Sequence, residues 1–257
     1  MKLNVQQLLQ KVRGKRGAPS SAKKEVESIL EERRNLLSPK SDFFVREAYK
    51  TLRTNVSFSL PGKKNRCIGI VSANRGEGKS TVSVNLAISL AQIDKKVVIV
   101  DCDMRIPTVA AKLGMENVPG LSDYLADEEG YSHLPVAHND TYNIDVIPAG
   151  TIPPDPTKLI ESPQMSELIE ALKLVYDYIV VDFPPVTVVS DSAILSSVID
   201  GYLIVTLHGS TEVSQMDETI RQLNFANANV LGFVYNSKPA SRKSYKKNSK
   251  YYYYEYR

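Results

Sequence analysis

Cysteine is scarce in this sequence: Cys67 and Cys102 are the only two in 257 residues. Each lies alone in an apolar segment that we expect to be a buried strand, so both are predicted to be reduced core residues. No CxxC pair and no Cys/His cluster occurs. The sequence therefore lacks the usual ligand patterns for a structural zinc ion or an iron–sulfur cluster.

Long apolar runs are also missing. No segment approaches the roughly 20 consecutive apolar residues that a membrane-spanning helix needs, and residues 1–17 contain no apolar core of a signal peptide. We therefore expect a cytoplasmic protein. A hydrophobic share of 42% is enough for a sizeable core, and the length suits one large α/β domain with terminal arms.

The net charge of +3 is unevenly distributed along the chain. Residues 1–40 hold ten Lys/Arg against four Glu, and residues 237–257 hold seven against one, so each segment carries +6. Residues 41–236 are left with −9. We expect a basic N-terminal arm, a globular domain and a flexible tail with these bounds. The arms either serve solubility or attract an anionic surface: inner-leaflet lipid, nucleic acid or a neighbouring subunit.

The segment RCIGIVSANRGEGKST, residues 66–81, carries the clearest chemical signal. Apolar residues 68–71 predict a buried strand, residues 72–78 a loop with two glycines, and Lys79 the start of a helix. The loop N–H groups, the positive end of the helix dipole and the Lys79 charge would together bind phosphate, with the Ser80 hydroxyl on Mg²⁺. Ala73 replaces the first glycine of GxxxxGK[ST]. The alternative is a glycine turn that caps a core helix.

Strands and helices alternate along the rest of the domain. We expect a helix capped by Asp42, with Phe44, Val45, Ala48, Leu52 and Val56 on its apolar face. The further predicted strands are 95–100, 144–147, 178–181, 202–207 and 230–235; the helices are 82–93, 159–175, 191–198 and 212–226; residues 119–132 and 136–141 are expected to be irregular. This order predicts an α/β fold: a doubly wound, mostly parallel sheet flanked by helices, as in P-loop NTPases.

Two aspartates, Asp101 and Asp182, follow predicted strand ends on the same sheet edge as the glycine loop. Carboxylates beside a polyphosphate usually serve Mg²⁺, directly or through water. Asp103 and Arg105 extend the first of them to DxDxR. Asp103 could orient the metal or accept a proton from an incoming hydroxyl. The alternative for Asp103 is a helix cap before Pro107.

The last 21 residues, SKPASRKSYKKNSKYYYYEYR, contain six of the fourteen tyrosines: Tyr245, Tyr251, Tyr252, Tyr253, Tyr254 and Tyr256. Interleaved Lys and Ser make a packed core implausible. Such a tail spans at most ~70 Å, against a radius of gyration of ~16 Å for the domain, so it could reach a neighbour's site as a phosphoryl acceptor. Phosphates would reverse its charge. The alternatives are a sticky tail or contacts to nucleic acid.

With these residues the sequence resembles the bacterial tyrosine kinases (BY-kinases), P-loop-type enzymes that regulate capsule and exopolysaccharide synthesis. The resemblance covers residues 42–257. The matching segments are EAYKTLRTN (47–55), the Walker A segment SANRGEGKST (72–81), the Walker A′ segment VIVDCDMR (98–105), AGTIPPDPTKLI (149–160), the Walker B segment YIVVDFPPV (178–186), LGFVYNSK (231–238) and the tyrosine cluster.

The resemblance implies an ATP-dependent protein-tyrosine kinase that uses Mg²⁺ and phosphorylates its own tail. The implied catalytic residues are Lys79, Asp101, Asp103 and Asp182, and the implied metal ligands are Ser80, Asp101 and Asp182. The implied ATP-binding residues are Asn74, Arg75, Gly76, Glu77, Gly78, Lys79, Ser80, Thr81 and, near the adenine, Asn236. The phosphorylation sites would be Tyr251, Tyr252, Tyr253, Tyr254 and Tyr256, and Glu47, Lys50 and Arg53 would stand at the oligomerisation motif ExxRxxR.

It also implies partners: a ring-like homo-oligomer that phosphorylates tails in trans, a separate transmembrane activator that recruits the chain to the inner face of the membrane, and a protein-tyrosine phosphatase. We do not expect nucleic acid as a partner. Lys50 departs from the motif's first Arg, which weakens bidentate pairing, and Phe183 replaces a common Thr. Asn74 stands where partition ATPases carry a signature Lys. The alternative function is a partition-like ATPase that binds DNA or membrane under nucleotide control.

Overall fold

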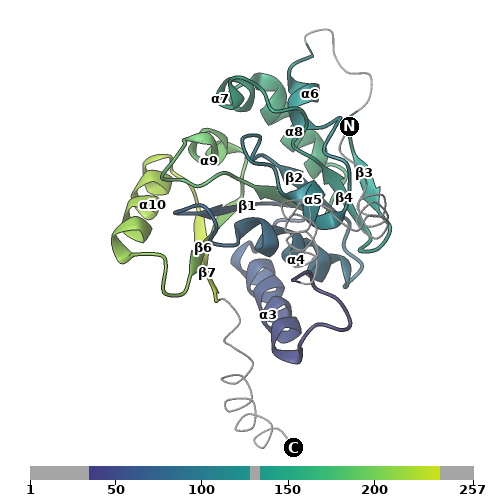
Figure 1. Ribbon diagram of the computed structural model, residues 1–257, viewed down its shortest axis with the longest axis vertical. Coiled ribbons are helices and arrows are strands. Elements are labelled where there is room, and N and C mark those ends of the chain that lie inside the picture. The colour runs from purple at the N-terminus through teal and green to yellow at the C-terminus, as the bar shows by residue number, and fades with distance from the viewer. Residues whose placement is uncertain (1–34, 128–133, 238–257) are drawn as a thin grey trace, which may run out of the picture.

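The computed structural model describes residues 35–127 and 134–237. Its centre is a seven-stranded sheet with helices on both faces (Figure 1), in the order β3-β4-β2-β5-β1-β6-β7. Only the β3–β4 pair is antiparallel among the pairings of these strands. The strands are β1 Arg66–Ser72, β2 Val97–Asp101, β3 Ala137–Asn139, β4 Ile144–Ile147, β5 Tyr178–Asp182, β6 Gly201–Leu207 and β7 Val230–Asn236. The predicted doubly wound, mostly parallel sheet is confirmed.

The helices divide into two layers. One layer holds α3 Phe43–Ser59, α4 Lys79–Ala91 and α5 Val109–Leu113; the other holds α6 Leu121–Leu125, α7 Pro156–Ile160, α8 Pro163–Lys173, α9 Asp191–Ile194 with the 3₁₀ turn Leu195–Ser197, and α10 Val213–Phe225. Each layer packs its own apolar cluster on the sheet. The inner strands β2, β5 and β6 are buried at every residue, which is why their sequences are apolar on both faces.

The strand register brings the predicted polar residues to one edge. In the β2–β5 pair Asp101 lies opposite Asp182, and in the β1–β5 pair Ile70 lies opposite Asp182. The glycine loop leaves β1 two residues after Ile70. Three carboxyl ends of parallel strands therefore meet at one place, where open α/β sheets bind their ligands.

The region predicted as one helix over 159–175 is two helices. The first ends at Ile160 with Glu161 as its C-cap, and Ser162 caps the second, because its hydroxyl accepts from the N–H of Met165 and Pro163 takes the first helical position. The prediction that residues 119–132 and 136–141 are irregular was also partly wrong, because these segments contain α6 and the short strand β3. The short helix α5 was not predicted.

The N-terminal part of the domain differs in its packing from expectation. Asp42 caps α3 as predicted, accepting from the N–H of Phe44. Val45 is 37% exposed and Ala48 is exposed, so neither belongs to the buried face. Leu36 and Leu37 instead pack into the core beside α4. Within the described parts of the chain, no helix combines the length and apolar character of a membrane span.

Candidate active site

The phosphate loop runs from the end of β1 to the start of α4, in the predicted strand–loop–helix order. Gly76 and Gly78 have left-handed φ angles of 82° and 94°. A Cβ atom at Gly78 would also collide with the side-chain amide of Asn236, so both the backbone angle and the space favour glycine there. The N-cap residue of α4 is Gly78, which has no side chain to cap the helix. Its first N–H groups and the helix dipole therefore suit an anion.

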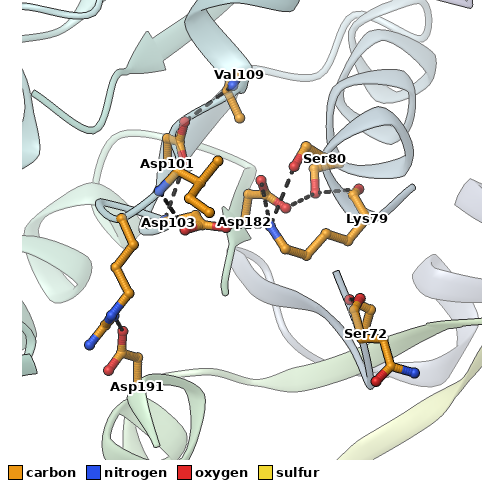
Figure 2. Close-up of polar contacts among 12 residues, drawn as sticks. Ser72, Lys79, Ser80, Asp101, Asp103, Val109, Asp182 and Asp191 are labelled. Atoms are coloured by element: carbon orange, nitrogen blue, oxygen red, sulfur yellow. Dashed lines mark hydrogen bonds and ion pairs between the residues drawn. The ribbon is translucent and has the colours of Figure 1, made fainter. Parts of the chain in front are cut away.

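Lys79 lies among carboxylates at the first turn of α4 (Figure 2). Its Nζ is 3.1 Å from Asp103 Oδ2 and 3.4 Å from Asp182 Oδ2. The Ser80 hydroxyl is also 3.4 Å from this nitrogen. Burial alone would lower the pKa of Lys79, but the neighbouring carboxylates outweigh it and raise the pKa above its ordinary value. The lysine is thus a fixed positive charge at the loop.

Asp101 and Asp182 are fully buried side by side. Asp101 accepts from the N–H of Asp103 with Oδ1 and of Val109 with Oδ2. Asp182 accepts from the Ser83 hydroxyl with Oδ1, at 3.0 Å, and faces Lys79 with Oδ2. Burial, and after it the Asp182 charge, raise the pKa of Asp101 to about 8. Through its two hydrogen bonds Asp101 also holds the turn after β2 and the start of α5, a role that the sequence did not reveal.

The donor set fits a magnesium ion that is shared with a nucleotide. Three carboxylates, those of Asp101, Asp103 and Asp182, gather around one lysine, so a divalent cation would balance the excess negative charge. Among the described residues, no three His, Cys, Asp or Glu side chains form a metal site by themselves. Mg²⁺ does not need three such ligands, because it usually takes one or two carboxylates and completes its coordination shell with water and phosphate oxygens.

Asp103 was predicted either to serve the metal or the acceptor hydroxyl, or to cap a helix before Pro107, and its two carboxylate oxygens have different contacts. Its Oδ1 accepts from the N–H of Ile106 at 3.1 Å, which closes the turn before Pro107, while its Oδ2 faces Lys79. The helix itself starts later, with Thr108 as the residue before Val109, so Asp103 is not a helix cap. The Oδ2 atom of Asp103 is therefore directed at Lys79 beside the phosphate loop.

Arg105 joins three segments through contacts outside the acid cluster, one of them to Asp191, which Figure 2 labels. Its Nη1 is 2.6 Å from Oδ2 of the buried Asp191, and its Nη2 donates to the Thr157 hydroxyl at 2.8 Å. That hydroxyl donates to Asp191 Oδ1 at 3.1 Å. The turn after β2 is thus tied to α7 and α9. Asp191 and Thr157 were not predicted as site residues, because their partner Arg105 is distant in the chain.

The remaining loop residues have different surroundings. Arg75 is exposed, and Thr81 is partly buried in the first turn of α4. Asn236, expected near an adenine, donates from Nδ2 to the Glu77 carbonyl at 2.9 Å and so contacts the phosphate loop itself. The Glu77 side chain is buried, and Asn74 contacts it.

The three residues of the candidate oligomerisation motif do not share one free face of α3. Glu47 and Lys50 form an exposed ion pair at 2.6 Å. Arg53 turns inward, and its Nη1 donates to the carbonyl of Ser89 on α4 at 2.7 Å. The predicted acceptor tyrosines Tyr251, Tyr252, Tyr253, Tyr254 and Tyr256 lie outside the described residues.

Comparisons with known proteins identify the family and the fold. The family model "ParA: NUBPL iron-transfer P-loop NTPase" matches residues 63–255. Tyrosine-protein kinase YwqD of Bacillus subtilis (strain 168) is 37% identical over 198 residues, which cover 77% of this chain and 83% of that protein. The kinase domain of the Escherichia coli tyrosine kinase ETK has a TM-score of 0.72 at 32% identity and covers 77% of this chain and 78% of that one.

A more distant structure shares the fold. The septum site-determining protein MinD of Pyrococcus horikoshii, in complex with Mg-ADP, has a TM-score of 0.58 at 26% identity, with 70% of this chain and 73% of that chain covered. The kinases therefore match more strongly than this relative does in both identity and TM-score. The chain belongs to the bacterial tyrosine kinases, a branch of the ParA-type P-loop NTPases.

Proposed function

We propose that this chain is an autophosphorylating protein-tyrosine kinase, which transfers the γ-phosphoryl group of ATP to tyrosines of its own C-terminal tail in trans. One observation carries the proposal: Lys79 Nζ lies between Asp103 and Asp182 at the base of the phosphate loop. A phosphate-binding cation therefore lies within 3.4 Å of both a candidate proton acceptor, Asp103, and a candidate metal ligand, Asp182.

ATP and Mg²⁺ are the proposed cofactors. The first turn of α4 and the loop N–H groups of residues 75–79 would bind the phosphates, and Asn236 would lie on the base side. Ser80, Asp101 and Asp182 would hold Mg²⁺, directly or through water. The ion would neutralise negative charge on the γ-phosphoryl group during its transfer. The Mg-ADP in the related MinD structure supports this assignment.

The side chains then have separate tasks in the transfer. Lys79 leaves its carboxylate partners and binds phosphate oxygens as the nucleotide enters. This frees Asp103 Oδ2, which accepts the proton of the attacking tyrosine hydroxyl as the new O–P bond forms and the bond to the β-phosphate oxygen breaks. Asp182 keeps its place through the Ser83 hydroxyl. The products are phosphotyrosine and ADP.

The acceptors we propose are Tyr251, Tyr252, Tyr253, Tyr254 and Tyr256, in the tail 237–257 of a neighbouring copy. Transfer in trans needs an oligomer, for which we propose a ring that uses the exposed ion pair of Glu47 and Lys50 on α3. Arg53, the third residue of the motif, would take part by exchanging its bond to Ser89 for one to the neighbouring copy. A separate transmembrane activator would hold the ring at the inner face of the membrane, and a protein-tyrosine phosphatase would reverse the modification. The related chains are named tyrosine-protein kinases, and the family resemblance extends the proposal to regulation of capsule or exopolysaccharide synthesis.

The experiment is to incubate the purified chain with Mg·ATP and to analyse the C-terminal peptide by mass spectrometry. The proposal requires phosphate on the tail tyrosines, and none in Lys79→Met. Lys95→Met, at an exposed lysine far from the loop, is the matched control and must keep the modification. Phosphotyrosine that persists in Lys79→Met, or its absence from the wild type, would reject the proposal.

A partition-like ATPase that binds DNA or membrane under nucleotide control is the second candidate. The match to the ParA family model favours it. Against it, the Asn74 side chain, at the position of the partition signature lysine, bonds within its own chain to Glu77 and Gln215. Steeply salt-dependent DNA binding without phosphate transfer to the tail would support this candidate over the kinase.

A further inference from the structure

Glu77 is an unexpected residue for a phosphate-binding loop. Its side chain is negative, and only 2% of the residue is exposed. No ion pair to Glu77 occurs among the described residues. A buried carboxylate costs desolvation free energy and repels the phosphates that the loop would bind. Its presence therefore calls for a compensating role.

The Glu77 carboxylate is satisfied by hydrogen bonds from two neighbours. Oε2 accepts from the Asn74 N–H at 3.0 Å, and Oε1 accepts from Asn74 Nδ2 at 3.2 Å and from the Thr211 hydroxyl at 2.6 Å. The Thr211 oxygen itself accepts from the N–H of Leu207 at 2.8 Å. Since a hydroxyl has one hydrogen, that hydrogen is left for Glu77.

A second bridge runs beside the first. Asn74 Nδ2 also donates to Gln215 Oε1 at 2.7 Å, and the same oxygen accepts from the N–H of Glu212 at 3.1 Å. Glu212 is the N-cap residue of α10. The phosphate loop is thus bonded through Glu77 to Thr211, in the loop between β6 and α10, and through Asn74 to the first turn of α10.

We propose that Glu77 is a positioning residue, which fixes the phosphate loop against the N-terminal end of α10 so that nucleotide binding and the position of this helix end are coupled. The inference rests on the proposed nucleotide site. Coupling of this kind is reciprocal: if α10 supports the loop, bound nucleotide stabilises the start of α10 by the same factor. A purely structural Glu77 would affect folding stability alone.

The first test measures Mg·ADP binding by titration calorimetry, with folding stability followed by thermal unfolding. Thr211→Val removes the donor to Glu77 at nearly constant volume, and we expect binding to weaken about tenfold, as for the loss of a hydrogen bond to a charged group. Thr211→Ser, which keeps the hydroxyl, restores binding to within about twofold. Thr219→Val is the matched control, because this buried α10 hydroxyl donates to the Gln215 carbonyl at 2.8 Å and makes no hydrogen bond to the phosphate loop in the described part of the chain.

The second test measures amide hydrogen exchange over residues 211–216 with and without Mg·ADP. We expect nucleotide to slow exchange in the wild type and to leave it unchanged in Glu77→Gln, whose amide cannot accept at both positions. Binding by Thr211→Val within twofold of the wild type, an equal loss in Thr219→Val, or full nucleotide protection in Glu77→Gln would each overturn the inference.

The two proposals fail in distinguishable ways. A wild-type chain that binds Mg·ADP and shows the expected coupling, yet transfers no phosphate to its tail, would overturn the kinase proposal and leave the role of Glu77 standing. A kinase that modifies its tail but tolerates Thr211→Val in nucleotide binding would do the reverse. A wild-type chain that does not bind Mg·ADP would overturn both.

Discussion

Asp101 and Asp182 face each other across the β2–β5 pair, and neither side chain is exposed to solvent. Asp103 and Asp182 each lie within ion-pair distance of one lysine, Lys79. Burial and the Asp182 charge raise the pKa of Asp101 to about 8, so ionising this second buried carboxyl costs folding stability until a cation joins the site. The site is therefore built at a cost to folding stability, and several measurable consequences follow from this arrangement.

Asp182→Asn should separate activity from stability. The variant removes one negative charge and keeps the shape and the bond to Ser83, so we expect the melting temperature without nucleotide to be equal to or higher than that of the wild type. Tail phosphorylation should fall about 100-fold or more, because the charge that would hold Mg²⁺ is lost. Thermal unfolding and phosphate incorporation test this, and near-normal incorporation would contradict the role of Asp182.

Mg·ADP should stabilise the domain, and removal of the ion should abolish the effect. At 100 times Kd, ligand binding adds about 2.7 kcal/mol, which corresponds to a rise in melting temperature of about 5–10 °C for a domain of this size. We expect EDTA to remove most of the shift, and Lys79→Met to remove it even with Mg²⁺ present. A shift of equal size in Lys79→Met would show that the nucleotide binds elsewhere.

Arg105→Met should destabilise the fold. It leaves the buried Asp191 without its ion pair, and because Arg105 is partly exposed we expect a loss of about 2–4 kcal/mol in the free energy of unfolding. Urea denaturation measures this. Arg221→Met is the matched control: it removes an exposed pair with Glu218 and should cause no measurable loss. Equal stability of the two variants would show that the Arg105 contacts contribute little.

Both cysteines should be unreactive in the folded chain. Cys67 and Cys102 are fully buried, and burial raises the pKa of both thiols. Since the thiolate is the reactive form, we expect iodoacetamide at pH 8 to modify them only after denaturation. The free thiols of the unfolded chain ionise near pH ~8.5, so the free energy of unfolding should fall as the pH rises above that value. Rapid labelling of the folded chain would contradict the described packing.

The sequence was sufficient for the fold because its signals are local. Apolar runs on both faces mark β2, β5 and β6, and the glycine loop marks the end of β1. The strand β3 was missed because three residues, AHN, show no alternation and pair only at the sheet edge. The break between α7 and α8 had a local signal, Ser162 followed by Pro163, which outweighs the helical spacing on either side.

The site was predictable only in part, for a physical reason. Strand ends in a parallel sheet share one edge, so the meeting of Lys79, Asp101 and Asp182 follows from the fold class. The bonds from Arg105 to Asp191 and from Glu77 to Thr211 join residues 86 and 134 positions apart. They depend on how the loops return to the sheet edge, which neither periodicity nor motif spacing specifies. Arg53 likewise follows a family motif in sequence but bonds to Ser89 in the structure.

The most direct test of the central claim is transfer between two defective chains. Lys79→Met keeps the tail and lacks the phosphate-binding lysine, while a chain truncated after residue 237 keeps the site and lacks every tail tyrosine. Each alone should incorporate no phosphate into a tail, and their mixture with Mg·ATP should place phosphotyrosine on the tail of the Lys79→Met chain. A mixture that stays unmodified while the wild type is labelled would contradict transfer from this site to a neighbouring copy.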